Sequence, residues 1–356
     1  IKPAIAVDSN NTPHVFWLIE DLNGGTFYAT NASGAWETTT VSEGYFYGPV
    51  DIAVGADDVP VIAYHDHQGR QFDPNLGDAV VGSLEGGEWT LTTIQDSGHD
   101  GWDTDVAVNA DGWHVGGVDP SQFGGRDSIE YATNAFGDIR VEQVGSGPNE
   151  YEFGVSIETA PNGIVGLTYF QCPRSCESVN ADSDDRNLVY AERSAGPDGS
   201  WTLTQVDTEG DVGRFSSLAY DADGNPHISY YVADSPSSGT VRYAWRDADG
   251  TWQFEDVGTV DNLMIGFTGA RKITSLVLDA DGVPHIAYTD RDTVTYASRT
   301  GDGEWTTQDI MTADEANLGQ LVELALDSNG TPHLTTFDVT NPRPLNGNIY
   351  YGTIVG

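Results

Sequence analysis

Short apolar segments alternate with polar turns along the whole chain, and one such pattern returns seven times. Its clearest copy runs from "SLVLD" through the turn "DADG" to "PHIAYTD", within residues 275–290. Such alternation predicts β-strands, and the glycine can adopt the positive φ that a tight turn needs. The seven copies are "NNTPHVFW" (10–17), "ADDVPVIAY" (56–64), "ADGWHVGGV" (110–118), "APNGIVGLTY" (160–169), "ADGNPHISY" (222–230), "ADGVPHIAY" (280–288) and "SNGTPHLTTF" (328–337).

Each copy continues into two further strand-like segments. A "YA"-like segment comes first, and most copies then reach a Gly-x-Trp-like turn that leads into a fourth strand. A repeat of roughly 50 residues with four short strands is typical of a propeller blade, and seven blades suit a closed ring. The marker residues are Tyr28, Tyr131, Tyr190, Tyr243, Tyr296 and Tyr351, followed by Trp36, Trp89, Trp201, Trp252 and Trp305.

The sequence therefore predicts an all-β fold, a seven-bladed β-propeller with four antiparallel strands per blade. The chain ends at "NIYYGTIVG", a third strand, so we expect three strands in the last blade or a short piece borrowed from residues 1–3. An exposed blade edge of this kind invites strand pairing with another chain. We expect one domain over residues 1–356, with blades at approximately 1–43, 48–95, 103–145, 153–207, 214–258, 271–311 and 320–356.

Repetition also separates scaffold from candidate chemistry. Five of the eight histidines share one repeat position, whereas a catalytic residue is needed once, so we interpret these five as scaffold: His14, His114, His227, His285 and His333. The histidines left without this explanation are His65, His67 and His99. The repeated "DADG" acids lack the ligand run of an EF-hand loop and suit turn chemistry, with weak calcium sites as the alternative. The sequence implies no other cofactor.

The charge of the chain is strongly negative, with 55 Asp and Glu against 15 Lys and Arg, a net charge of −40. Such a surface repels phosphates, so we expect no nucleic acid partner. No apolar run approaches the roughly 18–20 residues of a membrane helix. No signal peptide is visible, and we interpret the start at Ile1 as a processed one. Together with the acidic surface, this predicts a secreted or cell-surface protein.

Both cysteines lie in "CPRSC" as Cys172 and Cys176. We expect them to form a disulfide, given the predicted location outside the cytoplasm. Two thiols alone make a poor zinc site, which takes about four ligands. Free thiols remain the other alternative.

The two faces of a propeller differ here. Turns between the first two and the last two strands are short and repetitive, and we call their side the turn face. Loops between the second and third strands and the links between blades vary in length, and they form the variable face, where function is expected. Nine of the fifteen cations fall on the variable face: Arg70, Arg126, Arg174, Arg186, Arg214, Arg271, Lys272, Arg291 and Arg343. They indicate either an anionic ligand held by arginine forks or ordinary pairing with nearby acids.

The turns "DADGTW" (247–252) and "GDGEWT" (301–306) follow the Asp-box pattern with altered spacing. In these turns and in its repeat, the chain resembles the propellers allied to Asp-box (bacterial neuraminidase repeat) proteins. That group includes sialidase-like proteins, glycan-binding lectins and propeller ulvan lyases. For a lyase, the resemblance implies a His and a Tyr in acid–base catalysis beside an Arg that neutralises a uronate. His65, Tyr64 or Tyr169, and Arg70 or Arg174 would take these parts.

Two functions follow from these observations. The first is a secreted enzyme on an acidic polysaccharide or glycan, a polysaccharide lyase with a cation for the carboxylate, a base and an acid. The second is a non-catalytic glycan- or protein-binding propeller in adhesion or assembly. We expect the site on the variable face near the ring axis. Its candidate catalytic residues are His65, Tyr64, His99 and Tyr169, and its candidate ligand-binding residues are His67, Arg70, Arg126, Arg174, Arg214, Arg271, Lys272 and Trp102.

Overall fold

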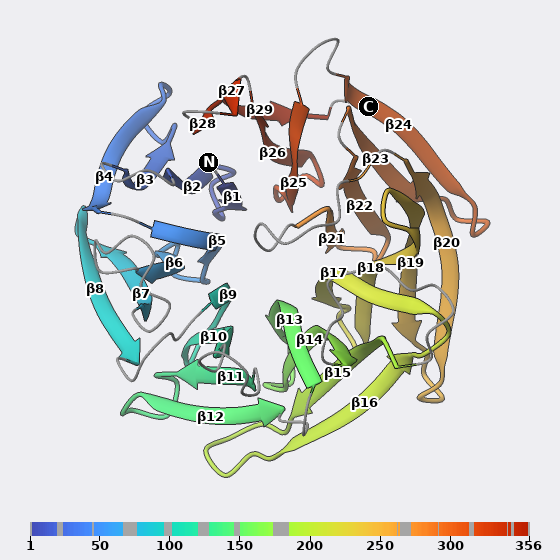
Figure 1. Ribbon diagram of the computed structural model, residues 1–356. Helices are drawn as coiled ribbons and strands as arrows, with labels where there is room; N and C mark the ends of the chain where they lie inside the picture. Colours follow the sequence, from blue (N-terminus) through green and yellow to red (C-terminus); the bar gives the residue numbers. More distant parts are fainter. Residues whose placement is uncertain are drawn as a thin grey trace.

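Seven antiparallel sheets stand around a central axis in the computed structural model (Figure 1). Six of these blades have four strands and the last has three, and the described residues contain no helix. The predicted seven-bladed propeller is therefore confirmed, including its three-stranded last blade. The structure describes residues 2–19, 24–44, 46–66, 77–95, 102–119, 128–145, 150–173, 185–261, 263, 272–290, 292–312, 317–339, 341–342 and 345–354.

Consecutive strands pair within each blade, as short polar turns allow for antiparallel neighbours. Blade 1 holds β1 (Lys2–Val7), β2 (Pro13–Ile19), β3 (Gly25–Thr30) and β4 (Glu37–Glu43), and blade 2 holds β5 (Phe46–Val54), β6 (Pro60–Asp66), β7 (Asp78–Glu85) and β8 (Glu88–Gln95). Blade 3 holds β9 (Trp102–Asn109), β10 (Gly112–Asp119), β11 (Ser128–Thr133) and β12 (Arg140–Gly145), and blade 4 holds β13 (Glu150–Thr159), β14 (Val165–Pro173), β15 (Asn187–Arg193) and β16 (Trp201–Asp207).

The remaining three blades follow the same order. Blade 5 holds β17 (Asp211–Tyr220), β18 (Pro226–Ser235), β19 (Ser238–Arg246) and β20 (Trp252–Val260). Blade 6 holds β21 (Thr274–Leu278), β22 (Pro284–Thr289), β23 (Thr293–Arg299) and β24 (Trp305–Thr312). Blade 7 holds β25 (Asn317–Leu326), β26 (Pro332–Val339) and β29 (Ile349–Thr353), with a small hairpin of β27 (Asn341–Pro342) and β28 (Leu345–Asn346).

The hydrophobic core lies between the blades rather than within one sheet. Phe16 and Leu18 of blade 1, for example, pack in one buried cluster with Ile52 and Ile62 of blade 2. The first strands surround the axis and the fourth strands form the rim (Figure 1). The rim strand β16 accordingly exposes most of its side chains, whereas its neighbour β15 buries most of its own.

The five repeated histidines are buried or nearly so, and each contacts a tyrosine of the third strand. His14 Nδ1 lies 2.5 Å from the Tyr28 hydroxyl and His114 Nδ1 lies 2.7 Å from that of Tyr131. Burial lowers the pKa of His114 to about 4. His227, His285 and His333 make the same contact with Tyr243, Tyr296 and Tyr351. This placement supports their interpretation as scaffold.

The same tyrosines join neighbouring blades. Four of them, and Tyr190 of blade 4, pack edge-to-face on a tryptophan from the next blade, with ring centroids 4.9 to 5.6 Å apart. The Tyr351–Trp36 pair closes the ring, because it joins blade 7 to blade 1. The other pairs are Tyr28–Trp89, Tyr131–Trp201, Tyr190–Trp252 and Tyr243–Trp305.

The repeated acids shape the turns of the turn face. Asp221 Oδ1 accepts hydrogen bonds from the backbone N–H groups of Asp223 (3.0 Å) and Asn225 (2.8 Å), and Asp279 does the same for Asp281 and Val283. These are Asx turns, so the predicted turn chemistry is present. Within the described ranges, no group of three or more His, Cys, Asp or Glu side chains is arranged to hold a metal ion.

Candidate functional site

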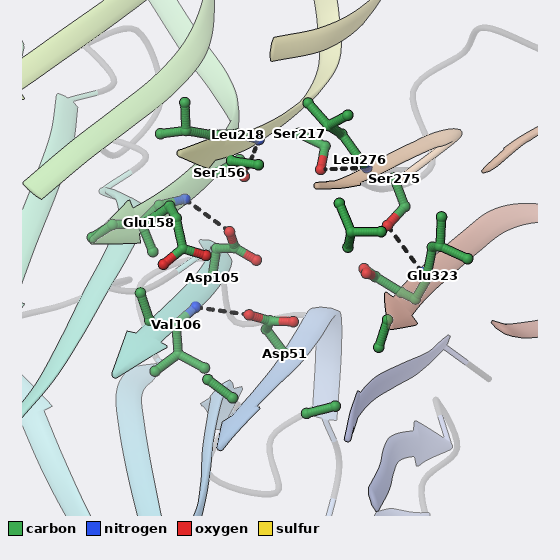
Figure 2. Close-up of a pocket in the computed structure, with 18 of the residues that line it drawn as sticks. Asp51, Asp105, Val106, Ser156, Glu158, Ser217, Leu218, Ser275, Leu276 and Glu323 are labelled. Carbon is green, nitrogen blue, oxygen red and sulfur yellow. Dashed lines mark hydrogen bonds between the residues drawn. The ribbon is translucent and has the colours of Figure 1, made fainter. Parts of the chain in front are cut away.

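The first strands of all seven blades line a cavity of about 490 Å³ on the ring axis (Figure 2). Pairing with the second strands aligns these first strands residue by residue, because Val7 lies opposite Pro13 as Val54 lies opposite Pro60 and Leu278 opposite Pro284. Two aligned positions, two residues apart, supply its polar groups. Residues two apart in a strand share one side of it, so both positions face the same way.

The position nearer the variable face, which we call the first ring, is polar in six of the seven blades. Five of its side chains each tie their blade to the next. Asp51 Oδ2 accepts a hydrogen bond from the backbone N–H of Val106 (2.9 Å), and Ser217 Oγ accepts one from Leu276 (3.0 Å). Asp105, Ser156 and Ser275 make the same bond to the following blade. The first ring consists of Ala4, Asp51, Asp105, Ser156, Ser217, Ser275 and Glu323.

Lys272 carries its ammonium into the first ring from the segment before β21. Its Nζ lies 2.6 Å from Asp105 Oδ1, 3.0 Å from Glu323 Oε1 and 3.5 Å from Asp51 Oδ1. Burial alone would lower the pKa of Lys272, but the three carboxylates outweigh it and raise that pKa well above its usual value. Burial and the neighbouring Asp105 raise the pKa of Asp51. Lys272 thus joins blade 6 to blades 2, 3 and 7.

The second ring lies two residues further along each first strand and is apolar in six blades. Its exception is Glu158, whose carboxyl points into the cavity beside that of Asp105 (Figure 2). Glu158 Oε1 accepts a hydrogen bond from the backbone N–H of Thr159 (2.7 Å). Burial, with a smaller effect of Asp105, raises the pKa of Glu158 to about 7. The second ring consists of Ala6, Ala53, Ala107, Glu158, Ala219, Val277 and Ala325.

The repeat also departs from its pattern directly beside Glu158. Gly166, which pairs with Glu158, stands where other blades carry the scaffold histidine. A Cβ at Gly166 would lie 2.1 Å from the Tyr220 hydroxyl, so a larger residue there would require the Tyr220 side chain to move. The Tyr220 hydroxyl lies 2.6 Å from that of Tyr190. Tyr190 is the third-strand tyrosine of blade 4, so Tyr220 makes the contact that the scaffold histidine makes in other blades. Tyr220 and Glu158, from neighbouring blades, both line the axial cavity.

The described lining of the cavity becomes more exposed toward the turn face. First-ring residues such as Asp51, Asp105 and Glu323 are buried, whereas Thr159 and Tyr220, near the ends of their strands, are partly exposed. The described lining is therefore most buried at the first-ring carboxylates and more exposed toward the short turns. The sequence pointed instead to the opposite, variable face.

The predicted catalytic pair Tyr64 and His65 lies in the interior of blade 2. Tyr64 is 1% exposed and packs against Phe16 and Phe46, with ring centroids 5.9 and 5.6 Å away. His65 is fully buried, and a Cβ at Gly77 would lie 2.1 Å from its Cε1. Successive strand residues point to opposite sides, so the structure does not bring these two side chains together. Neither lines the axial cavity.

Tyr169 and Arg214 are also interior residues. Tyr169 is fully buried in the core between blades 3 and 4. Arg214 binds Asp211 through Nε (2.5 Å) and Nη2 (3.1 Å) and lies 4.4 Å above the Phe170 ring. Arg186 Nη1 reaches the same carboxylate at 2.9 Å. Within the described ranges, the variable-face cations Arg186, Arg214 and Lys272 thus all pair with acids.

Several predicted residues lie outside the described residues. They are His67, Arg70, His99, Arg126, Arg174 and Arg271, together with Cys176 and the side chain of Trp102. Cys172 is fully buried at the end of β14, and its pairing with Cys176 stays a prediction. The roles assigned to these residues, and those of His65, Tyr64 and Tyr169, stay predictions as well.

A second, polar groove of about 360 Å³ lies between blades 5 and 6. It is lined by β20 on one side and by hydroxyl and carboxylate groups of blade 6 on the other, including Thr293, Thr307 and Asp290. Thr295 Oγ1 donates a hydrogen bond to Asp309 Oδ1 (3.0 Å) at its wall. Burial raises the pKa of Asp290.

Sequence reasoning missed Glu158, Asp51, Asp105 and Glu323. One signal was available, since alignment of the first strands places Glu158 in a column of alanine and valine. The repeat was aligned on its second strands, whose histidines and prolines drew attention away from the first. The contact of Lys272 with three other blades could not be seen, because it joins residues 51, 105, 272 and 323 across the axis.

No family model matches the chain, and no curated protein matches it. Solved structures do resemble it. The polysaccharide lyase Uly1 has a TM-score of 0.59 at 9% identity, covering 99% of this chain and 89% of the lyase. An alpha-L-arabinanase of Penicillium chrysogenum scores 0.52 at 12% identity, covering 88% and 94%, and a lectin of Aleuria aurantia scores 0.51 at 12%, covering 88% and 95%. These likenesses confirm the predicted resemblance at the level of the fold.

The sequence predicts no membrane helix, and the structure bears on this only for the residues that it describes. Among the described residues, no helix is long and apolar enough to cross a membrane.

Proposed function

We propose that this protein binds a hydroxyl-rich glycan in the axial cavity. The observation that carries the proposal is Glu158, the one polar side chain of the second ring, in a cavity of about 490 Å³. Concave sites of ~300–1,000 Å³ with a few converging polar groups are the usual places for small ligands. Glu158 is also the ring member whose pKa burial raises to about 7, and such groups concentrate at functional sites.

The chemistry of the lining favours an uncharged glycan over a polyanion. Carboxyl groups accept hydrogen bonds from sugar hydroxyls, and a protonated Glu158 can also donate one. The ammonium of Lys272 is already held by three carboxylates, so it does not serve an anionic group. A net charge of −40 further repels a polyanion. The anionic ligand predicted from the sequence would have to be held by the variable-face arginines outside the described residues.

The fold neighbours support the choice of ligand class. They include proteins named as a polysaccharide lyase, an arabinanase and a lectin, which differ in chemistry but share carbohydrate as substrate or ligand. Fold alone does not determine function, so the argument rests on the cavity. A protein that meets such glycans outside the cell fits the predicted secretion and the acidic surface.

A glycan-processing enzyme is the second candidate, and the raised pKa of Glu158 favours it. A carboxyl that is still protonated near pH 7 can act as a general acid toward a leaving oxygen. The nearby Asp105 carboxylate would then face the same substrate (Figure 2). The lyase predicted from the sequence would act instead at the variable face, with His65 as base, Tyr64 or Tyr169 as acid and an arginine on the uronate.

Binding and turnover can be separated with one set of proteins and glycans. Neutral and uronate-containing oligosaccharides are titrated into the chain by calorimetry, then into Glu158→Gln and Glu88→Gln, the same change at the exposed first residue of β8. We expect a neutral glycan to bind the chain and Glu88→Gln equally, and Glu158→Gln at least about tenfold more weakly. Binding that is unaffected by Glu158→Gln would refute the cavity as the site.

The same mixtures report on catalysis. New reducing ends that form without an ultraviolet-absorbing product, and that disappear in Glu158→Gln, would identify a hydrolase. An ultraviolet-absorbing unsaturated product from a uronate polymer would identify the lyase and move the site to the variable face.

A further inference from the structure

The residues that break the ring pattern of the axial cavity gather between two blades. One residue beyond the second ring, each first strand contributes another side chain to the cavity lining, and we call this set the third ring. Five of its members are aliphatic, and the exceptions are Thr159 of blade 4 and Tyr220 of blade 5. Glu158 and Gly166 depart from the pattern in the same blade 4, so these departures lie where blades 4 and 5 meet. The third ring consists of Val7, Val54, Val108, Thr159, Tyr220, Leu278 and Leu326.

Tyr220 reaches from blade 5 to blade 4 and ends beside Glu158. Its hydroxyl occupies the place of a side chain at Gly166, because a Cβ there would lie 2.1 Å from it. Gly166 pairs with Glu158, and directly paired residues of antiparallel strands have Cβ positions ~4.5–5.5 Å apart on one face of the sheet. Burial is the main cause that raises the pKa of Tyr220, and the nearby Glu158 carboxylate raises it further. The phenol oxygen and the carboxyl therefore share one side of the cavity.

A chain of hydrogen bonds fixes the direction of the Tyr220 proton. Arg246 Nη2 lies 2.8 Å from Glu192 Oε2, and the hydroxyl of Tyr190 donates to the same carboxylate oxygen at 2.9 Å. A hydroxyl has one proton, so the Tyr190 oxygen accepts from Tyr220, whose oxygen lies 2.6 Å away. The Tyr220 proton is thus directed at Tyr190, and no other described group bonds to the Tyr220 oxygen. What this oxygen offers to a ligand is a hydrogen-bond acceptor.

We propose that Tyr220 determines specificity in the glycan site, because its oxygen accepts a hydrogen bond from a sugar hydroxyl and cannot donate one. This inference rests on the proposed binding of a glycan in the axial cavity, and it names what is selected: a free hydroxyl at the position beside Glu158. An ether oxygen, a deoxy carbon or a fluorine there leaves the phenol oxygen without its donor. In five other blades the third-strand tyrosine contacts a scaffold histidine, and none of these histidines lines the cavity.

Fluorinated sugars test this selection. The probes are cellobiose, mannobiose and galactobiose and, for each, the isomers in which one hydroxyl is replaced by fluorine, which is close to a hydroxyl in size but donates no hydrogen bond. For a disaccharide that binds the parent chain, we expect one fluoro isomer to bind about tenfold more weakly than the unmodified sugar. Tyr220→Phe should remove this difference by weakening the unmodified sugar to the level of that isomer. Calorimetry and fluorine NMR measure the affinities.

Two further variants separate the direction of the proton from packing. Tyr190→Phe takes away the acceptor of the Tyr220 proton, so Tyr220 can turn this proton toward the ligand. The loss of affinity of the same fluoro isomer should then shrink to about twofold. The matched control is Tyr131→Phe, the same change at a third-strand tyrosine that contacts His114 and does not line the cavity. It should bind every probe as the parent chain does.

The outcomes distinguish this inference from the proposed function. If no disaccharide binds the parent chain, or if Glu158→Gln binds as well as the parent chain does, the glycan site fails and the role of Tyr220 fails with it. If Glu158→Gln weakens binding but Tyr220→Phe leaves the loss of every fluoro isomer unchanged, only the role of Tyr220 is overturned. A tenfold loss that persists in Tyr190→Phe would overturn the acceptor role even if Tyr220→Phe does not fold.

Discussion

The two rings of the axial cavity are built from the same first strands, but polar residues recur around the first ring and occur only once in the second. The first ring is polar in six blades, and its Asp and Ser side chains make the same bond to the next blade. The second ring is apolar in six blades, and Glu158 has no counterpart in it. A polar group that recurs around a ring serves the ring itself. A polar group that occurs once, at a cost in desolvation, calls for a separate explanation.

Charge sharpens this contrast. The three carboxylates of the first ring share one ammonium, so their burial is offset within the protein. Glu158 has a hydrogen bond from Thr159 but no cation at its carboxyl among the described contacts. Its charge is instead avoided by a raised pKa, which leaves a titratable group facing the cavity. The predictions below test each side of this difference.

Removal of the Lys272 ammonium should have the largest effect. In Lys272→Met, Asp51, Asp105 and Glu323 keep their burial without a cation, and we expect the free energy of unfolding at pH 7 to fall by about 3–5 kcal/mol. The pKa values of Asp51 and Glu323 are already raised in the folded state. The folded chain then binds more protons than the unfolded one, so the defect should grow as pH rises above about 4. Urea unfolding at pH 5 and pH 8 measures it.

The matched control is a cation in a more exposed pair. Arg246 lies 2.8 Å from Glu192, with both side chains 28% exposed, and Arg246→Met should cost about 1 kcal/mol or less. A Lys272→Met defect no larger than this control, or one that shrinks as pH rises, would contradict the first-ring account.

The fold could be predicted from the sequence because the seven blades share one pattern of strands and turns. The Tyr and Trp markers give the length of the repeat. A histidine that occurs at the same position in five copies could be interpreted as structural for that reason. The last blade was predicted from the strand type at which "NIYYGTIVG" ends, and its sheet has three strands.

The site was less readable for two physical reasons. Lys272 sits on a link between blades, and only closure of the ring brings it within 2.6 Å of Asp105. Tyr64 and His65 are adjacent in sequence, so they look like partners, yet the pleat of β6 turns them to opposite sides. Local spacing thus predicted strands and turns well, while contacts across the axis depend on the closed ring.

The second ring is tested by neutralising its carboxyl. The pKa of Glu158 is about 7 in the folded chain and near its usual value of ~4.3 when unfolded. Its ionisation therefore lowers stability as pH rises from about 4 to about 7, and the loss persists at higher pH. Glu158→Gln keeps an oxygen for the Thr159 N–H and removes the charge. We expect it to stabilise the fold by about 1–2 kcal/mol at pH 8 and to change little at pH 4.

Thermal unfolding of Glu158→Gln and of the control Glu88→Gln, at the exposed first residue of β8, measures the difference across this pH range. The account of Glu158 fails if Glu158→Gln is as pH-dependent as the parent chain, or if Glu88→Gln shows the same gain.

The smallest expected effect belongs to a single link of the first ring, and it can be read at one amide. Ser217→Ala removes the oxygen that accepts from the backbone N–H of Leu276 at 3.0 Å. We expect a loss of about 1 kcal/mol, the usual value for one buried hydrogen bond. Hydrogen exchange should quicken at Leu276 but not at Leu324, whose N–H bonds to the untouched Ser275 Oγ, also at 3.0 Å. Equal quickening at both amides would mean that the links act as one cooperative ring, whereas none at Leu276 would mean that this bond does not hold the blades together.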